Sequence, residues 1–136
     1  MLIDVQSKAV YMKQIGEGLI SLQKKAQGAL SVISSIQDVL TLLKEFKAEE
    51  MSGLARDKIV LVEDAGTTTL APVLSRLKGV VCTSGALGSH LAIVTREFGI
   101  PALMATKIDY DGSLDNRIVR IEPGDGTTGF LLIEEP

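Results

Sequence analysis

Residues 82–102 read Cys-Thr-Ser-Gly-Ala-Leu-Gly-Ser-His-Leu-Ala-Ile-Val-Thr-Arg-Glu-Phe-Gly-Ile-Pro-Ala. The apolar run at residues 79–82 fits a buried strand, and the small residues after it let the backbone turn tightly beside a ligand. Ser89 is a suitable N-cap for a helix that begins near His90. Gly99 and the proline two residues later end that helix, because glycine adopts the left-handed stop and proline cannot continue a helix. The stretch therefore predicts a strand, a loop, a short helix and a second strand.

His90 is the only histidine of the chain, and it stands at the expected N-terminus of this helix. Unpaired backbone N–H groups and the positive end of the helix dipole collect at that point, so it binds phosphate well. Histidine is also a nucleophile that forms covalent intermediates. This combination suggests that His90 accepts a phosphoryl group and that Gly85, Gly88 and Ser89 bind the phosphate. The alternative is a structural histidine bonded to backbone, with Ser89 as a helix cap and the two glycines shaping the turn.

The same residues resemble the phosphohistidine, or swivelling, domain of phosphoenolpyruvate-utilising enzymes. That family includes phosphoenolpyruvate synthase, pyruvate phosphate dikinase and enzyme I of the sugar phosphotransferase system. Its pattern is roughly Thr-x-x-Gly-Gly-x-Thr-Ser-His-x-Ala-Ile-x-x-Arg-Glu-x-Gly-Ile-Pro-Ala, and residues 82–102 keep its spacing. The resemblance implies that His90 is the phosphorylated residue. It also implies an α/β fold of three layers, the swivelling β/β/α domain, over residues 53–136.

Three positions differ from this pattern: Cys82 and Gly88 stand where the family has threonine, and Ala86 stands where it has glycine. Beyond the pattern, Ala105 stands where the family usually has a glycine after the next strand. A threonine hydroxyl can donate to a phosphate oxygen, so these changes leave two hypotheses open. The first is a stand-alone phosphohistidine carrier that accepts a phosphoryl group at His90 and passes it on. The second is an oligomeric scaffold or regulatory module that keeps the fold without phosphotransfer.

Residues 1–52 differ in kind from the rest, because their apolar residues recur with the seven-residue period of a coiled coil. One series is Val5, Met12, Leu19, Ala26, Ile33 and Leu40, and the other is Lys8, Ile15, Leu22, Ala29, Ile36 and Leu43. This pattern predicts a long N-terminal helix. A helical hairpin is the alternative, since the glycines at positions 16, 18 and 28 each cost a helix about 1 kcal/mol.

The apolar stripe of these helices must be covered by something. We expect a homodimer, or a higher even oligomer, held together through residues 5–46. Packing of the segment against its own domain is one alternative, and docking of a different protein is the other. In this interpretation a coiled-coil-like oligomerisation segment (residues 1–52) precedes the phosphohistidine domain (residues 53–136).

Strand and helix signals alternate in the second part of the chain. The expected strands cover residues 58–63, 79–82, 102–104, 117–122 and 130–133. A helix is expected from the threonines at residues 67–69 through residue 78. Arg96 points away from the apolar stripe of the His90 helix, so we expect it to be solvated or paired rather than catalytic.

Composition excludes several classes of protein. The net charge is −3 and aromatic residues make up 4%, which argues against a nucleic-acid surface. No apolar stretch is long enough to span a membrane, and one cysteine fits a reducing cytoplasm. The aspartates at positions 109, 111 and 115 match no metal-binding loop, so we interpret them as a solvated turn and expect no metal.

Nucleotide binding by the chain itself is not expected, because no glycine-rich loop is followed by Lys-Ser or Lys-Thr. The chain therefore needs no cofactor of its own. We expect a kinase or synthase partner, acting in trans, to supply the phosphoryl donor, either phosphoenolpyruvate or ATP. The protein would then be a phosphotransferase component that does not turn over alone.

Overall fold

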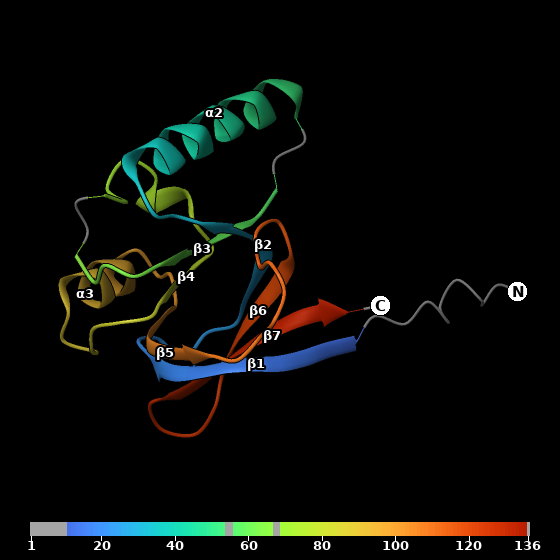
Figure 1. Ribbon diagram of the computed structural model, residues 1–136. Helices are drawn as coiled ribbons and strands as arrows, with labels where there is room; N and C mark the ends of the chain where they lie inside the picture. Colours follow the sequence, from blue (N-terminus) through green and yellow to red (C-terminus); the bar gives the residue numbers. More distant parts are fainter. Residues whose placement is uncertain (1–10, 54–55, 67–68, 136) are drawn as a thin grey trace, which may run out of the picture.

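The chain folds into a mixed α/β structure in which strands close into a barrel and helices lie outside it (Figure 1). The structure, a computed structural model, describes residues 11–53, 56–66 and 69–135. Its elements are β1 (Tyr11–Ile20), β2 (Ala26–Val32), α2 (Ile36–Ser52), β3 (Lys58–Val62), η1 (Leu74–Arg76), β4 (Gly79–Cys82), α3 (His90–Glu97), β5 (Ala102–Ile108), β6 (Ile118–Pro123) and β7 (Thr128–Glu135). The α/β class and the strands expected from residue 58 onward are confirmed, with β5 and β7 longer than expected.

Strand order around the barrel is β1-β5-β4-β3-β2-β6-β7. Neighbouring strands from β2 through β3 and β4 to β5 run parallel, whereas β1 pairs antiparallel with both β5 and β7. The expected β/β/α arrangement has two separate sheet layers and one helical layer. In the structure the strands instead form one closed barrel, with α2 and α3 on its outside. Among the described residues, no helix is long and apolar enough to cross a membrane.

The parallel strands are buried on both faces, which explains why they read as short apolar runs rather than as alternating patterns. Their side chains alternate between two cores. The core inside the barrel receives Ile59, Val81 and Leu103. The core between the barrel and the helices receives Val60, Val62, Val80, Cys82, Ala102 and Met104, together with residues of α2 and α3. Each short strand thus joins the helical layer to the barrel interior.

The predicted long N-terminal helix is wrong for residues 11–35, which hold β1 and β2. A Cβ at Gly18 would lie 2.6 Å from the Met104 carbonyl oxygen, so the glycine lets β1 approach β5 closely. The sheet also crosses the predicted domain boundary at residue 53, because β1 and β2 pair with later strands. Residues 1–10 lie outside the described residues. Self-association through residues 5–46 stays a prediction, without the continuous helix on which it rested.

The helical period does persist in α2, although a different stripe of it is buried. Ser35 caps this helix with Asp38 in a capping box, and Gly53 ends it in the left-handed conformation. The buried residues of α2 are Val39, Leu42 and Phe46. By contrast, Ile36 and Leu40, which belong to the two predicted heptad series, are 56% and 45% exposed. The seven-residue series therefore did not identify the face that packs on the barrel.

Residues 69–78 hold turns and η1 instead of the expected helix. The N–H of Val73 donates to the Leu70 carbonyl, and that of Arg76 donates to the Val73 carbonyl, both at 2.9 Å. These bonds span three residues, as in turns and 3-10 helices. Pro72 disfavours the α conformation at residue 71, in the first turn of the expected helix.

Lys58 is a buried cation beneath α2, with 5% of its surface exposed. Its Nζ lies 3.2 Å from Glu49 Oε2 and 3.7 Å from Glu45 Oε2, so ion pairs join β3 to the helix. Burial raises the pKa of Glu49, but the hydrogen bond from the Arg56 N–H and the contact with Lys58 outweigh it. The net result is that the pKa of Glu49 lies below its ordinary value of 4.5.

Glu49→Gln should make the protein less sensitive to acid. A depressed folded-state pKa gives a stability contribution that is present above the unfolded pKa and is lost as pH falls through the folded pKa. We expect the melting temperature of the wild type to fall more steeply than that of the variant between about pH 5 and about pH 3. Glu50→Gln, which removes an exposed partner of Arg76, should keep the wild-type slope. Equal slopes for Glu49→Gln and the wild type would contradict the prediction.

Candidate functional site

His90 is the first residue of α3, and its side chain is exposed. The helix follows the carboxyl end of β4 through the loop of residues 83–89, a position where α/β proteins commonly bind ligands. The opposite face of α3, formed by Leu91, Ala92 and Thr95, is buried against the barrel. The predicted helix start is therefore confirmed, and the buried face of α3 fixes the helix on which His90 stands.

Hydrogen bonds to backbone carbonyls and from backbone N–H groups hold the first part of this loop between two strands. The Thr83 N–H donates to the Val62 carbonyl at 3.0 Å, and the Ser84 hydroxyl donates to the Glu63 carbonyl. On the other side, the Ala105 N–H donates to the Ser84 carbonyl at 2.8 Å. The loop is thus anchored to the end of β3 and to the middle of β5.

Gly85 is required by the backbone, whereas Gly88 is not. Gly85 has a φ of +81°, and a Cβ there would lie 2.7 Å from Ala65 Cβ, 2.8 Å from Ser89 Oγ and 2.9 Å from Met104 Cε. Gly88 lies outside the left-handed region, and a Cβ there would meet no atom within 4 Å. Sequence reasoning treated the two glycines alike, but only Gly85 has a conformation and surroundings that exclude a side chain.

Ser89 occupies the expected N-cap position but does not cap the helix with its side chain. Its Oγ accepts a hydrogen bond from the Ala86 N–H at 2.8 Å, and its own N–H donates to the Ala86 carbonyl at 3.0 Å. Near the helix start, the Leu91 N–H donates to the Ala65 carbonyl at 3.0 Å. The cap interpretation of the hydroxyl is therefore wrong. The side chain closes the loop before the helix.

Ser89→Ala should loosen this loop, because the Ala86 N–H loses its acceptor. The loop is exposed and water can replace the bond, so we expect a loss of about 1 kcal/mol in the free energy of unfolding. Denaturant unfolding measures that loss. The comparison variant is Ser113→Ala, whose hydroxyl accepts only a long 3.4 Å bond from the Asp115 N–H. Equal stability of the two variants would show that the Ser89 bond contributes nothing to the fold.

Arg96 is paired, as expected, but its partners belong to the site. Its Nη2 donates to the Leu87 carbonyl in the loop at 3.2 Å, and its Nε donates to the Ser21 carbonyl at 2.9 Å. The guanidinium thus ties the second half of the loop to the connection between β1 and β2. Sequence reasoning missed this role, since the acceptors are backbone carbonyls that carry no residue signature and Ser21 was expected within a helix.

Ala105 is strained, with a φ of 49° in a region that favours glycine. This is the position at which the family usually has glycine, and its N–H supports the loop through the Ser84 carbonyl. Ala105→Gly should therefore stabilise the protein by about 1 kcal/mol, because the left-handed conformation costs alanine about that much. Thermal unfolding measures the gain. Ala102→Gly in the same strand, with ordinary φ, should destabilise the protein instead. A lower melting temperature for Ala105→Gly would contradict the prediction.

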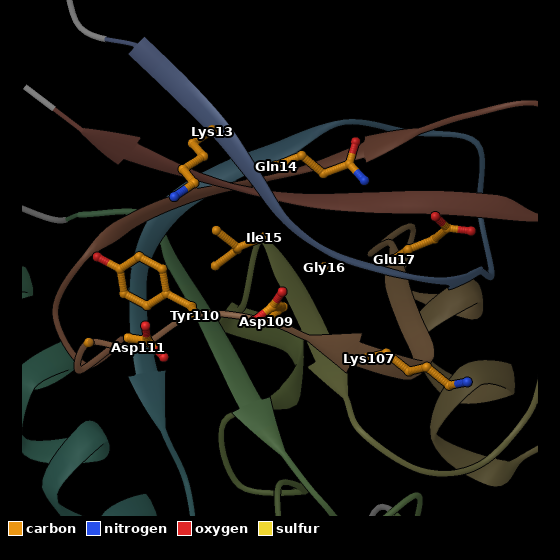
Figure 2. A pocket seen from close by; sticks show the side chains of 10 residues that line it. Lys13, Gln14, Ile15, Gly16, Glu17, Lys107, Asp109, Tyr110 and Asp111 are labelled. Atoms are coloured by element: carbon orange, nitrogen blue, oxygen red, sulfur yellow. The ribbon is translucent and has the colours of Figure 1, made fainter.

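Other features of the surface lie away from this loop. A hollow of about 600 Å³ is lined by residues of β1 and by residues 107–112 (Figure 2). Its charged side chains are of both signs: Lys13, Lys107, Glu17, Asp109 and Asp111. These charges largely cancel, so the hollow shows no preference for an anion such as phosphate. Within the part of the chain that the structure describes, no three His, Cys, Asp or Glu side chains gather as metal ligands. Asp109 and Asp111 belong to no such group.

Comparisons with known proteins point to the same segment. The sequence profile described as the PEP-utilising enzyme, mobile domain, matches residues 55–129. A probable phosphoenolpyruvate synthase of Archaeoglobus fulgidus is 31% identical over 86 residues, which are 63% of this chain and 11% of that protein. A protein of the phosphoenolpyruvate-dependent phosphotransferase system of Salmonella typhimurium is 38% identical over 77 residues, 56% of this chain and 10% of that protein.

A third relative is the chondramide synthase of Chondromyces crocatus. It is 28% identical over 114 residues, which are 84% of this chain but 3% of that protein. The chain thus spans between 3% and 11% of the length of these three relatives. The matched segments are small parts of much larger proteins, so the similarity concerns one domain and not the activity of the whole relative.

Proposed function

The chain belongs to the family of mobile domains of phosphoenolpyruvate-utilising enzymes, and from this premise we propose that it carries a phosphoryl group on His90. The observation that supports the proposal is the placement of His90. Its exposed side chain stands at the start of α3, beside a loop anchored on β3 and β5. An exposed imidazole on a fixed helix can reach a phosphorus atom held by another protein surface.

The chemistry is a pair of phosphoryl transfers. The lone pair of a neutral imidazole nitrogen attacks the phosphorus of the donor, and the P–O bond to the leaving group breaks with its electrons on oxygen. An acceptor oxygen later attacks the same phosphorus, and the histidine leaves with the electron pair of the N–P bond. The start of α3 favours the charged phosphoryl oxygens, because the positive end of the helix dipole lies there.

The donor site belongs, in this proposal, to a separate kinase or synthase. Phosphoenolpyruvate is the donor to test first, since the names of two relatives refer to it, and ATP is the second donor to test. Groups that stabilise the transferring phosphoryl in its transition state, such as cationic side chains or a metal ion, would come from that donor site.

The second candidate function is a module that keeps the fold without phosphotransfer. The Ser84 hydroxyl donates to the Glu63 carbonyl, and Gly88 adds no hydroxyl where the family pattern has threonine. Such a loop offers a phosphate fewer hydroxyl donors than the pattern does. This candidate predicts that the chain stays unlabelled under conditions in which family members are phosphorylated.

Radiolabelling distinguishes the two candidates. The purified chain is incubated with labelled phosphoenolpyruvate or labelled ATP, alone and with an extract of its source organism. A carrier acquires phosphate that is lost in acid and kept in base, as expected for phosphohistidine, and mass spectrometry under basic conditions locates it. Phosphate that is stable in acid, or no phosphate at all, would contradict the carrier function.

A further inference from the structure

The outer face of α2 carries apolar side chains that the barrel does not cover. Ile36 is 56% exposed and Leu40 is 45% exposed, while Leu43 is partly buried. A groove of about 580 Å³ runs between this face and the segment around η1, with Leu40, Leu43 and Pro72 as its apolar lining. Figure 1 shows α2 on the outside of the molecule, separate from α3. The groove is therefore an accessible apolar surface on a well-formed helix.

Cations dominate the rim of this groove. Lys44, Lys47 and Arg76 line it, against the single carboxylate of Glu50. Arg76 is held in place, because its Nη2 lies 2.8 Å from Glu50 Oε1 and its guanidinium lies 5.6 Å from the centre of the Phe46 ring. The groove is thus net positive on a chain whose net charge is −3.

We propose that this groove binds an amphipathic helix of another protein, with acidic residues beside its apolar stripe. Apolar side chains at helical spacing would contact Leu40, Leu43 and Pro72, and carboxylates would pair with Lys44 and Lys47. A second copy of this chain is a poorer occupant. Two-fold pairing of the groove with its own copy would bring two net-positive surfaces together, and like charges disfavour that arrangement. The proposal does not depend on phosphorylation of His90.

Peptide binding to the full chain tests the charge and shape of the partner. The probe is a fluorescent synthetic helix of about five turns with leucine at i, i+3, i+4 and i+7 and glutamate beside this stripe. Fluorescence anisotropy should show binding that weakens as salt is added. A matched peptide with lysine in place of every glutamate should bind at least about tenfold more weakly. Equal binding of the two peptides, or binding that salt does not change, would overturn the proposal.

Variants of the chain locate the binding surface. The double variant Leu40→Asp with Lys44→Glu should bind the acidic peptide with an affinity lower than that of the wild type by at least about tenfold. The control pair is Ile93→Asp with Lys107→Glu, which makes the same kinds of change on exposed residues outside the groove and should bind as the wild type does. If the first pair fails to fold, Lys47→Glu alone, on an exposed side chain, provides the test. Unchanged affinity in the groove variants would contradict the proposal.

Sedimentation of the full chain tests the rival occupant. We expect Leu40→Asp to leave the sedimentation coefficient of the wild type unchanged. A wild-type dimer that Leu40→Asp dissociates would show that a second copy fills the groove, and would overturn the proposal of an acidic partner.

Discussion

Replacing His90 by alanine should abolish acid-labile phosphorylation and leave the fold intact. The imidazole is the only one in the chain, so no other residue can form phosphohistidine. Because the side chain is exposed, its loss should change the free energy of unfolding by no more than about 0.5 kcal/mol. Radiolabelling followed by acid treatment measures the first effect, and thermal unfolding measures the second.

Ile93→Ala is the matched control for this variant. Ile93 lies one turn further along α3 and is 42% exposed, so its truncation perturbs the same helix face without removing the nucleophile. We expect this control to accept phosphate as the wild type does. Phosphate that persists in His90→Ala would place the acceptor on another residue, and the carrier function of His90 would then be wrong.

Gly85→Ala should cause the largest loss of stability among the loop variants, about 3 kcal/mol. A left-handed backbone costs alanine about 1–2 kcal/mol, and forcing a methyl group into a packed site costs about 1–3 kcal/mol more. The atoms that the methyl group would meet include Ala65 Cβ and Ser89 Oγ. The loop must therefore shift, and phosphorylation of His90 should fall with it. Denaturant unfolding and radiolabelling measure the two effects.

Gly88→Ala separates a steric effect from a general effect of removing glycine. The added methyl group would meet no atom within 4 Å, and the backbone there lies outside the left-handed region. We expect a change of no more than about 0.5 kcal/mol and wild-type labelling. If both glycine variants behaved alike, the crowding around Gly85 would not control the loop.

The expected results for the two glycines also bear on the departures from the family pattern. Gly88 replaces a threonine in a place where the structure leaves room for a side chain, so the loop conformation does not require glycine there. Ala105 replaces a glycine in a place where the backbone does favour glycine. The first difference removes a hydroxyl without altering the backbone, and the second adds strain beneath the loop.

Much of the fold around the site could be predicted from the sequence because the signals are local. Apolar runs of four or five residues predicted β3 and β4, since parallel strands buried on both faces need such runs. The small residues before His90 and the glycine at position 99 predicted both ends of α3. The residues that build the loop, the helix start and the next strand are contiguous, so their spacing alone placed His90.

Only the tertiary structure determined the conformation of residues 11–32, which hold β1 and β2. The seven-residue spacing of apolar residues there suited a helix, but β1 is formed by pairing with β5 and β7, which lie far along the chain. The same reason applies to Arg96, whose acceptor on Ser21 lies 75 positions away. A helix draws its hydrogen bonds from residues four positions apart, whereas a strand draws them from whichever segment the fold places beside it. Local pattern therefore determined the His90 helix, and non-local pairing determined the barrel that supports it.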